Sequence, residues 1–263
     1  MTVAQAHPTP ATPAPEIQEK LPVITWEKLP ETYVLPDDPV DNVYQPAIAA
    51  ALTESLQLAG RLPETAITPT NYGICATVDG QLVVKAPDWA YVPRIAVTRA
   101  EIDRSYTPNL QGDPLLLVLE FLSPTDGGEY STKATYPPGK WFFYEQILQV
   151  PYYGIFEPIS GDLAFYQLDA TRRYREMLRD VEGHYWFPEL DLALGARIGV
   201  RENREGYWLR WWDNTGQLLL LGSERVEEQN KQLEAERQKA EAERQRAERL
   251  TQQLRNLGIE PES

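Results

Sequence analysis

The stretch Leu115-Leu-Leu-Val-Leu-Glu-Phe-Leu122 contains a single charged side chain, Glu120, close to its end. A continuous apolar run of this length is typical of a β-strand buried on both faces, because a strand with one solvated face alternates apolar and polar residues. A carboxylate inside such a strand is costly, since burial disfavours its charged form. The run therefore predicts a central strand and marks Glu120 as a candidate functional group at the strand's C-terminal end, where polar sites of open sheets tend to lie.

Short apolar segments bounded by turn signals lie on both sides of this run. Asp79-Gly80 separates two such segments and indicates a β-hairpin. Residues 41–58 have the spacing of an amphipathic helix with Asp41 as its cap and Gly60 near its end, and Lys140–Gln149 also has helical spacing. Further strands are expected at 87–92, 152–156, 163–168, 174–178, 207–212 and 218–221.

This order of elements predicts an α/β (α+β) domain, with a mixed central sheet flanked by helices and an antiparallel extension. The composition changes at both ends of the domain. Residues 1–24 are rich in proline and poor in large apolar groups, so we expect a disordered arm there. Residues 25–222 form the expected core domain, and residues 223–263 a long charged C-terminal helix.

The C-terminal segment repeats a seven-residue unit, Ala235-Glu-Arg-Gln-Lys-Ala-Glu241, which recurs from Ala242 with only Lys239 changed to Arg246. One apolar row follows the repeat. It consists of Val226, Leu233, Ala240, Ala247 and Leu254. So thin a row fits a solvated single helix held by charge pairs as well as it fits a coiled coil, so the tail is a candidate contact for a second copy or a partner helix.

The charge balance argues against a surface that attracts phosphate everywhere, since 39 acidic residues outnumber 25 Lys and Arg to give a net charge of −14. Any phosphate-binding surface must be local. The single cysteine, Cys75, has apolar neighbours and is expected in the core, which fits a reducing cytoplasm. No apolar stretch approaches membrane-spanning length. Two histidines, His7 and His184, are too few for a histidine metal site or a Ser-His-Asp triad.

Asp88 is a second carboxylate in a segment predicted to be a strand. It is a weaker candidate than Glu120, because it follows Pro87 at the start of an alternating strand and not inside an apolar run. Two carboxylates at the ends of neighbouring strands would present several hard oxygens to one point, which suits Mg²⁺ or Mn²⁺. Lys140 opens the next helix directly after Gly139 and is a candidate cation beside a phosphate.

Four motifs in this order resemble a restriction-endonuclease-like family abundant in cyanobacteria, a branch of the PD-(D/E)XK nuclease superfamily. They are Pro87-Asp-Trp-Ala-Tyr-Val92, Leu119-Glu-Phe-Leu-Ser123, Gly139-Lys-Trp-Phe-Phe-Tyr-Glu-Gln146 and Val150-Pro-Tyr-Tyr-Gly-Ile-Phe-Glu157. The resemblance covers roughly residues 72–212 and implies a metal-dependent endonuclease acting on nucleic acid, with DNA as the expected substrate. It implies Asp88 and Glu120 as metal ligands and Lys140 as the catalytic lysine.

The sequence departs from the superfamily at one position. The usual lysine lies two residues after the acidic ligand, where this chain has Leu122. Lys140 is expected to replace it in space, with Lys133 as the second candidate. Ser123 and Tyr144 are expected to be accessory polar groups.

Structural roles remain open for each of these residues. Asp88 fits a turn or cap, Glu120 a buried partner of Arg94, and Lys140 an ordinary surface residue at a helix start. We expect three tryptophans to pack against a sheet and not to stack on nucleic-acid bases. They are Trp208, Trp211 and Trp212. The net charge and Leu122 also fit a second function, a catalytically degenerate nuclease fold that serves as a binding or scaffolding module through its helical tail.

Overall fold

The computed structural model describes residues 22–30, 44–122 and 128–256. The arm's residues 1–21, the expected cap Asp41 and the accessory Ser123 lie outside the described residues. The helical elements are α1 (Tyr44–Leu58), the 3-10 helix η1 (Arg99–Ile102), α2 (Lys140–Phe142), the π-helical turn η2 (Phe143–Ile147) and α3 (Gly222–Asn256). The strands are β1 (Ile24–Thr25), β2 (Gly73–Val78), β3 (Gln81–Lys85), β4 (Trp89–Tyr91), β5 (Ser105–Tyr106), β6 (Leu117–Phe121), β7 (Tyr152–Phe156), β8 (Leu163–Leu168), β9 (Tyr174–Glu176), β10 (Tyr185–Phe187), β11 (Leu192–Arg201) and β12 (Arg204–Asp213).

The central sheet has five strands in the order β4-β6-β7-β8-β9. The pair β6–β7 is parallel and the other pairs are antiparallel, so the sheet is mixed. Every residue of β6 and β7 is buried, which confirms the central strand predicted from the apolar run. The connection from β6 to β7 passes through α2 and η2, and β8 and β9 form the antiparallel extension.

The predicted hairpin is also confirmed and belongs to a second sheet. Strands β2 and β3 pair across Asp79 and Gly80, which both have positive φ, 49° and 77°. Positive φ at both central residues is the type I′ geometry that Asp-Gly favours. Strands β1 and β5 pair with β2 and complete this sheet.

The prediction that residues 207–212 and 218–221 extend the central sheet is wrong. Strand β12 joins a separate three-stranded sheet, β10-β11-β12, rather than the extension of the central sheet. Residues 218–221 do not form a strand, and Leu218 makes only an isolated bridge to Trp212. Strand β11 escaped prediction because Gly195 and Gly199 interrupt its apolar pattern.

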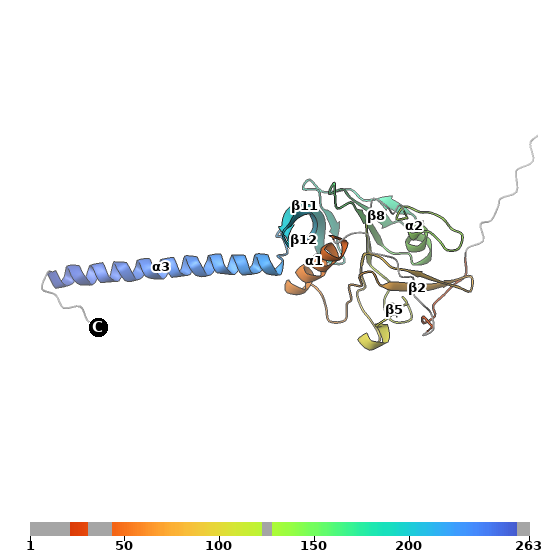
Figure 1. The fold of residues 1–263 in the computed structure, drawn as a ribbon, viewed down its shortest axis with the longest axis horizontal. Coiled ribbons are helices and arrows are strands. Elements are labelled where there is room, and N and C mark those ends of the chain that lie inside the picture. The colour runs from red at the N-terminus through yellow and green to blue at the C-terminus, as the bar shows by residue number, and fades with distance from the viewer. Residues whose placement is uncertain (1–21, 31–43, 123–127, 257–263) are drawn as a thin grey trace, which may run out of the picture.

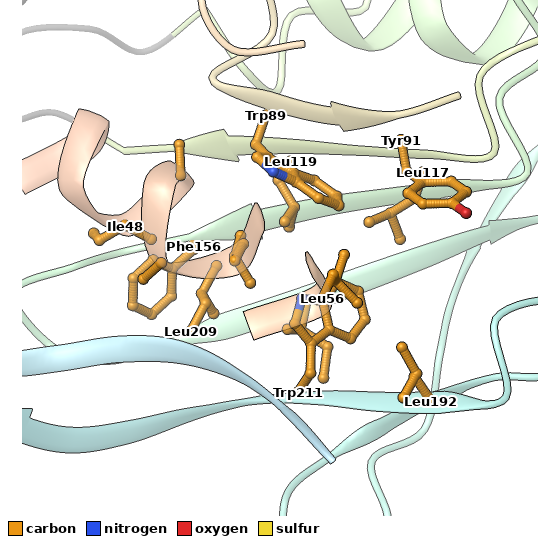
Figure 2. Close-up of a cluster of buried hydrophobic side chains, with 14 of the residues drawn as sticks. Ile48, Leu56, Trp89, Tyr91, Leu117, Leu119, Phe156, Leu192, Leu209 and Trp211 are labelled. Atoms are coloured by element: carbon orange, nitrogen blue, oxygen red, sulfur yellow. The ribbon is translucent and has the colours of Figure 1, made fainter. Parts of the chain in front are cut away.

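Two hydrophobic clusters lie on the two faces of the central sheet. Alternate β6 residues Leu117, Leu119 and Phe121 face one cluster, which includes residues of α1 and β12. Figure 2 shows Trp89 and Leu119 on this face, across from Trp211. Val118 faces the other cluster, which contains residues of η2. Because side chains alternate along a strand, Glu120 points to the side of Val118 and η2.

The helix α3 projects from the body as a single long rod (Figure 1). Its 35 residues span about 52 Å at 1.5 Å per residue. Its root lies beside α1, while α2 lies on the opposite side of the body (Figure 1). Among the described residues, no helix combines the length and the apolar character that crossing a membrane requires.

Candidate functional site

Asp88 and Glu120 lie opposite each other on neighbouring strands. Asp88 directly precedes β4, and the antiparallel register pairs Trp89 with Leu119, which places Asp88 across from Glu120. The Asp88 Oδ2 accepts a hydrogen bond of 2.5 Å from the backbone N–H of Phe121. Burial raises the pKa of Asp88, although the Phe121 N–H acts in the opposite direction.

Glu120 is fully buried and its two oxygens are bound by different partners from the following helix. The Tyr144 hydroxyl donates to Oε1 at 2.8 Å, and the Lys140 ammonium group donates to Oε2 at 3.1 Å. Burial raises the pKa of Glu120 to about 8, and Asp88 adds to this effect while Lys140 opposes it.

Lys140 enters the site from the first residue of α2. Gly139 is required before it, because a Cβ atom there would lie 2.2 Å from the Ser131 carbonyl oxygen. The Lys140 side chain is 22% exposed. Burial lowers its pKa, but the carboxylates of Glu120 and Asp88 outweigh burial and raise it overall. The ammonium group therefore stays charged at neutral pH.

Glu129 is a fourth member of this cluster that sequence reasoning missed. Its Oε1 lies 3.5 Å from the Lys140 Nζ, and its side chain is 2% exposed. The Tyr153 hydroxyl donates to its backbone carbonyl at 2.8 Å. Glu129 stands in a stretch of Gly, Ser and Thr, which reads as a solvated loop, so no periodicity signalled its burial.

The remaining candidates divide into those near the cluster and those away from it. Tyr144 contacts Glu120 directly, as described. Lys133 is exposed, and its backbone carbonyl accepts a hydrogen bond from Gly139. Lys85 on β3 is a further cation near the cluster, which sequence reasoning did not single out: burial lowers its pKa, as does the charge of Lys140, while Glu120 raises it.

The structure also shows the partners of Arg94 and of the three tryptophans. Arg94 is not the partner of Glu120, because its guanidinium group pairs with Asp113 at 2.7 Å. Trp208 and Trp211 are buried against the sheets, as expected. Trp212 stacks on His184 with 3.8 Å between ring centroids.

The donor atoms of this cluster fit a hard divalent cation. Asp88 and Glu120 supply carboxylate oxygens, and the buried Glu129 Oε2 has no hydrogen-bond partner within the described part of the chain. Such an orphaned buried oxygen calls for an unseen partner. Among the described residues, no three His, Cys, Asp or Glu side chains gather as a metal cluster. Mg²⁺ keeps several waters and needs only one or two carboxylates, so Asp88 and Glu120 are the residues that would hold such an ion.

The mixed α+β domain with a long C-terminal helix has the architecture of a restriction-endonuclease-like protein. The chain belongs to the Uma2 family, described as putative restriction endonuclease, whose profile matches residues 41–201. The matched region ends with β11, so β12 and α3 lie beyond it. No curated protein matches the chain.

Proposed function

We propose that this protein is a metal-dependent phosphodiesterase of nucleic acid, a DNA endonuclease with a site of the PD-(D/E)XK type. The observation that carries the proposal is the convergence of Asp88, Glu120 and Lys140, which come from the residue before β4, from β6 and from α2. Family membership supports the same class of activity. Lys140 reaches Glu120 from the helix, in place of the lysine that the superfamily pattern would have at Leu122.

Asp88 and Glu120 would hold one Mg²⁺ or Mn²⁺ ion. When bound, such an ion polarises the scissile phosphate and lowers the pKa of a water molecule. Tyr144 fixes the orientation of the Glu120 carboxylate by donating to Oε1. The Lys140 ammonium group would stabilise the negative charge that develops on the phosphate.

The acidic protein also needs a local positive surface to attract a phosphodiester. Lys85 and Lys140 repel each other, and Lys133 adds to the positive charge around Lys85. Lys85 and Lys140 therefore form a local group of cations beside the acidic pair, although the whole chain carries a charge of −14. This group is where the substrate's phosphates would bind.

The test is a cleavage assay with purified full-length protein, Mg²⁺ or Mn²⁺, and separate supercoiled DNA, linear DNA and RNA substrates. We expect metal-dependent cleavage that EDTA abolishes. Asp88→Asn and Glu120→Gln should each reduce it at least 100-fold, the scale of losing a central electrostatic group. The matched control is Glu176→Gln, an exposed acid on β9, which should cleave normally.

A second function is supported by one observation. Glu120 is already paired with Lys140 and Tyr144, as it would be in a degenerate site that only stabilises the fold. Such a protein would act as a binding or scaffolding module, with α3 as a contact for a second copy or a partner helix. Absence of cleavage on every substrate, together with absence of Mg²⁺ and Mn²⁺ binding by a protein that melts cooperatively, would favour this function over the nuclease.

A further inference from the structure

Glu129 has a carboxylate that the contacts within the protein leave half satisfied. Its Oε1 faces the Lys140 ammonium at 3.5 Å, a long ion pair. Its Oε2 is buried and has no hydrogen-bond partner among the described residues. Buried polar atoms in folded proteins nearly always have a partner, so this oxygen, beside the charged Lys140, is available to a ligand.

The position of Glu129 is built into the fold. The Tyr153 hydroxyl, which belongs to the buried strand β7, donates to the Glu129 carbonyl. Two residues later, the Ser131 carbonyl accepts a hydrogen bond from Phe142 in α2. The same element that presents Lys140 therefore also anchors the segment that presents Glu129.

The charges around Lys140 also lack compensation. Three carboxyl groups act on the Lys140 ammonium, those of Glu120, Asp88 and Glu129. One ammonium group balances one of them, and the next cation, Lys85, is half-buried on β3. A cluster with surplus carboxylates and an orphaned oxygen is chemically suited to a divalent cation.

We propose that Glu129 is a third acidic residue of the metal centre, with Oε1 orienting Lys140 and Oε2 binding a water molecule in the hydration shell of the cation. This inference rests on the proposed function, in which Asp88 and Glu120 hold the ion. A contact through water follows from the described residues, in which no three acidic side chains gather closely enough to ligate one ion directly. Mg²⁺ retains several of its waters in such sites.

The experiment measures the affinity of the full-length protein for Mn²⁺ and Mg²⁺ by isothermal titration calorimetry, without nucleic acid. We expect Glu129→Gln to bind either ion 10- to 100-fold more weakly, the usual effect of losing a group that supports a metal's ligands. The matched control is Glu145→Gln, a buried acid on η2 whose carboxylate binds the Tyr174 N–H and Arg173 instead. Its affinity should equal that of the wild type.

A double variant separates the two roles of Glu129. If Oε2 acts on the ion's hydration shell, Glu129→Gln should weaken binding equally in the wild type and in a Lys140→Met background. If the effect disappears in that background, Glu129 acts only through Lys140 and the inference is wrong. Glu129→Asp keeps the charge but draws it back by one methylene group, and should bind with intermediate affinity. If Glu129→Gln does not fold, the metal affinity of Glu129→Asp tests the role of Glu129 instead.

The outcomes distinguish this inference from the proposed function. Wild-type affinity in both Glu129→Gln and Glu129→Asp, alongside metal binding by the wild type, would overturn the role of Glu129 alone. Failure of the wild type to bind either ion would overturn both proposals. Cleavage assays on the same variants then report separately on turnover.

Discussion

The buried ion pair of Lys140 and Glu120 adds little to the free energy of unfolding, and its importance lies in the charge balance of the cluster. Bringing both groups out of water costs free energy that their mutual attraction only partly returns. The pair is kept in a cluster where Asp88 and Glu129 add further negative charge, so its charge balance changes as soon as a cation or a phosphate enters. That sensitivity is expected of a site that binds charged ligands.

Lys140→Met should reduce DNA cleavage by roughly two or more orders of magnitude, because the variant keeps the packing of the stem and loses one electrostatic stabiliser. Metal binding should persist, since Asp88 and Glu120 remain. The loss of the pair with Glu120 should destabilise the fold by about 1–3 kcal/mol, measured by urea denaturation. Lys133→Met is the control and should cleave normally. If cleavage is lost in Lys133→Met and kept in Lys140→Met, Lys133 is the catalytic cation.

Cys75 should resist thiol reagents in the native protein. The side chain is fully buried in β2, and burial raises its pKa to about 11. Only the thiolate reacts, so at pH 8 about one thiol in a thousand would be in the reactive form even with free access. Reaction with a chromogenic disulfide should be slow in buffer and complete in urea. Rapid labelling of the native protein would show that β2 opens easily.

At the level of single residues, the sequence singled out the carboxylates in or next to strands and missed the one in a loop. Glu120 stood out against five apolar neighbours, and Asp88 followed from the strand that Pro87 opens. Glu129 gave no such signal, since its burial depends on Tyr153 and on α2, which are distant in the sequence. The sequence also predicted that Lys140 would reach the acidic pair in place of a lysine at Leu122, and its ammonium group lies 3.1 Å from Glu120 Oε2.

Among the elements, predictions held where one periodicity covered a whole segment. The apolar strands β6, β7 and β8 and the Asp-Gly hairpin were predicted closely, whereas β11 was hidden by its glycines. The helix after Gly139 was predicted, but not its π-helical turn, in which Leu148 N–H bonds to the Phe143 carbonyl. Such turns recur at functional sites, and this one contains Tyr144. Its geometry depends on packing that the sequence pattern does not encode.

Gly154 on β7 lies against side chains of the neighbouring strands and allows a test of the packing of the central sheet. An added Cβ would lie 2.4 Å from a Phe165 ring carbon and 2.6 Å from a Leu119 methyl carbon. Gly154→Ala should therefore lower the free energy of unfolding by about 1–3 kcal/mol, the usual cost of overpacking a core. Gly206→Ala on β12 has open space around the new methyl group and should change stability by less than about 0.5 kcal/mol. Equal effects of the two variants in urea denaturation would contradict this packing.

On the scale of the whole molecule, α3 is joined to the body at its root and free beyond it. Glu224 binds Arg210, which is buried, at 2.6 Å. The first residue of the helix, Gly222, donates its N–H to Glu54 of α1. Farther along, the ion pairs join residues within the helix, as in Lys231–Glu227 and Arg244–Glu248.

Deleting residues 229–263 should leave the body folded, because the removed helix is exposed and buries little apolar area. The free energy of unfolding should stay within about 0.5 kcal/mol of the wild type, and metal binding should be unchanged. Loss of the near-UV circular dichroism or of cooperative melting would show that the tail is part of the domain.

The root of the helix supplies the contrasting variant. Glu224→Ala leaves the buried Arg210 guanidinium with the Leu219 carbonyl as its remaining described acceptor. The expected loss is about 1–3 kcal/mol in urea denaturation. A stable Glu224→Ala protein would mean that Arg210 reaches water once its partner is removed.

The rod-like α3 also affects how the protein moves through a solution. A body with a helix of about 52 Å attached at one end experiences more hydrodynamic drag than a sphere of the same 30.0 kDa mass. A monomer should therefore elute early from a gel-filtration column, at the volume of a heavier globular protein, and sediment slowly. Light scattering, which measures mass independently of shape, is needed before any early peak is assigned to a dimer.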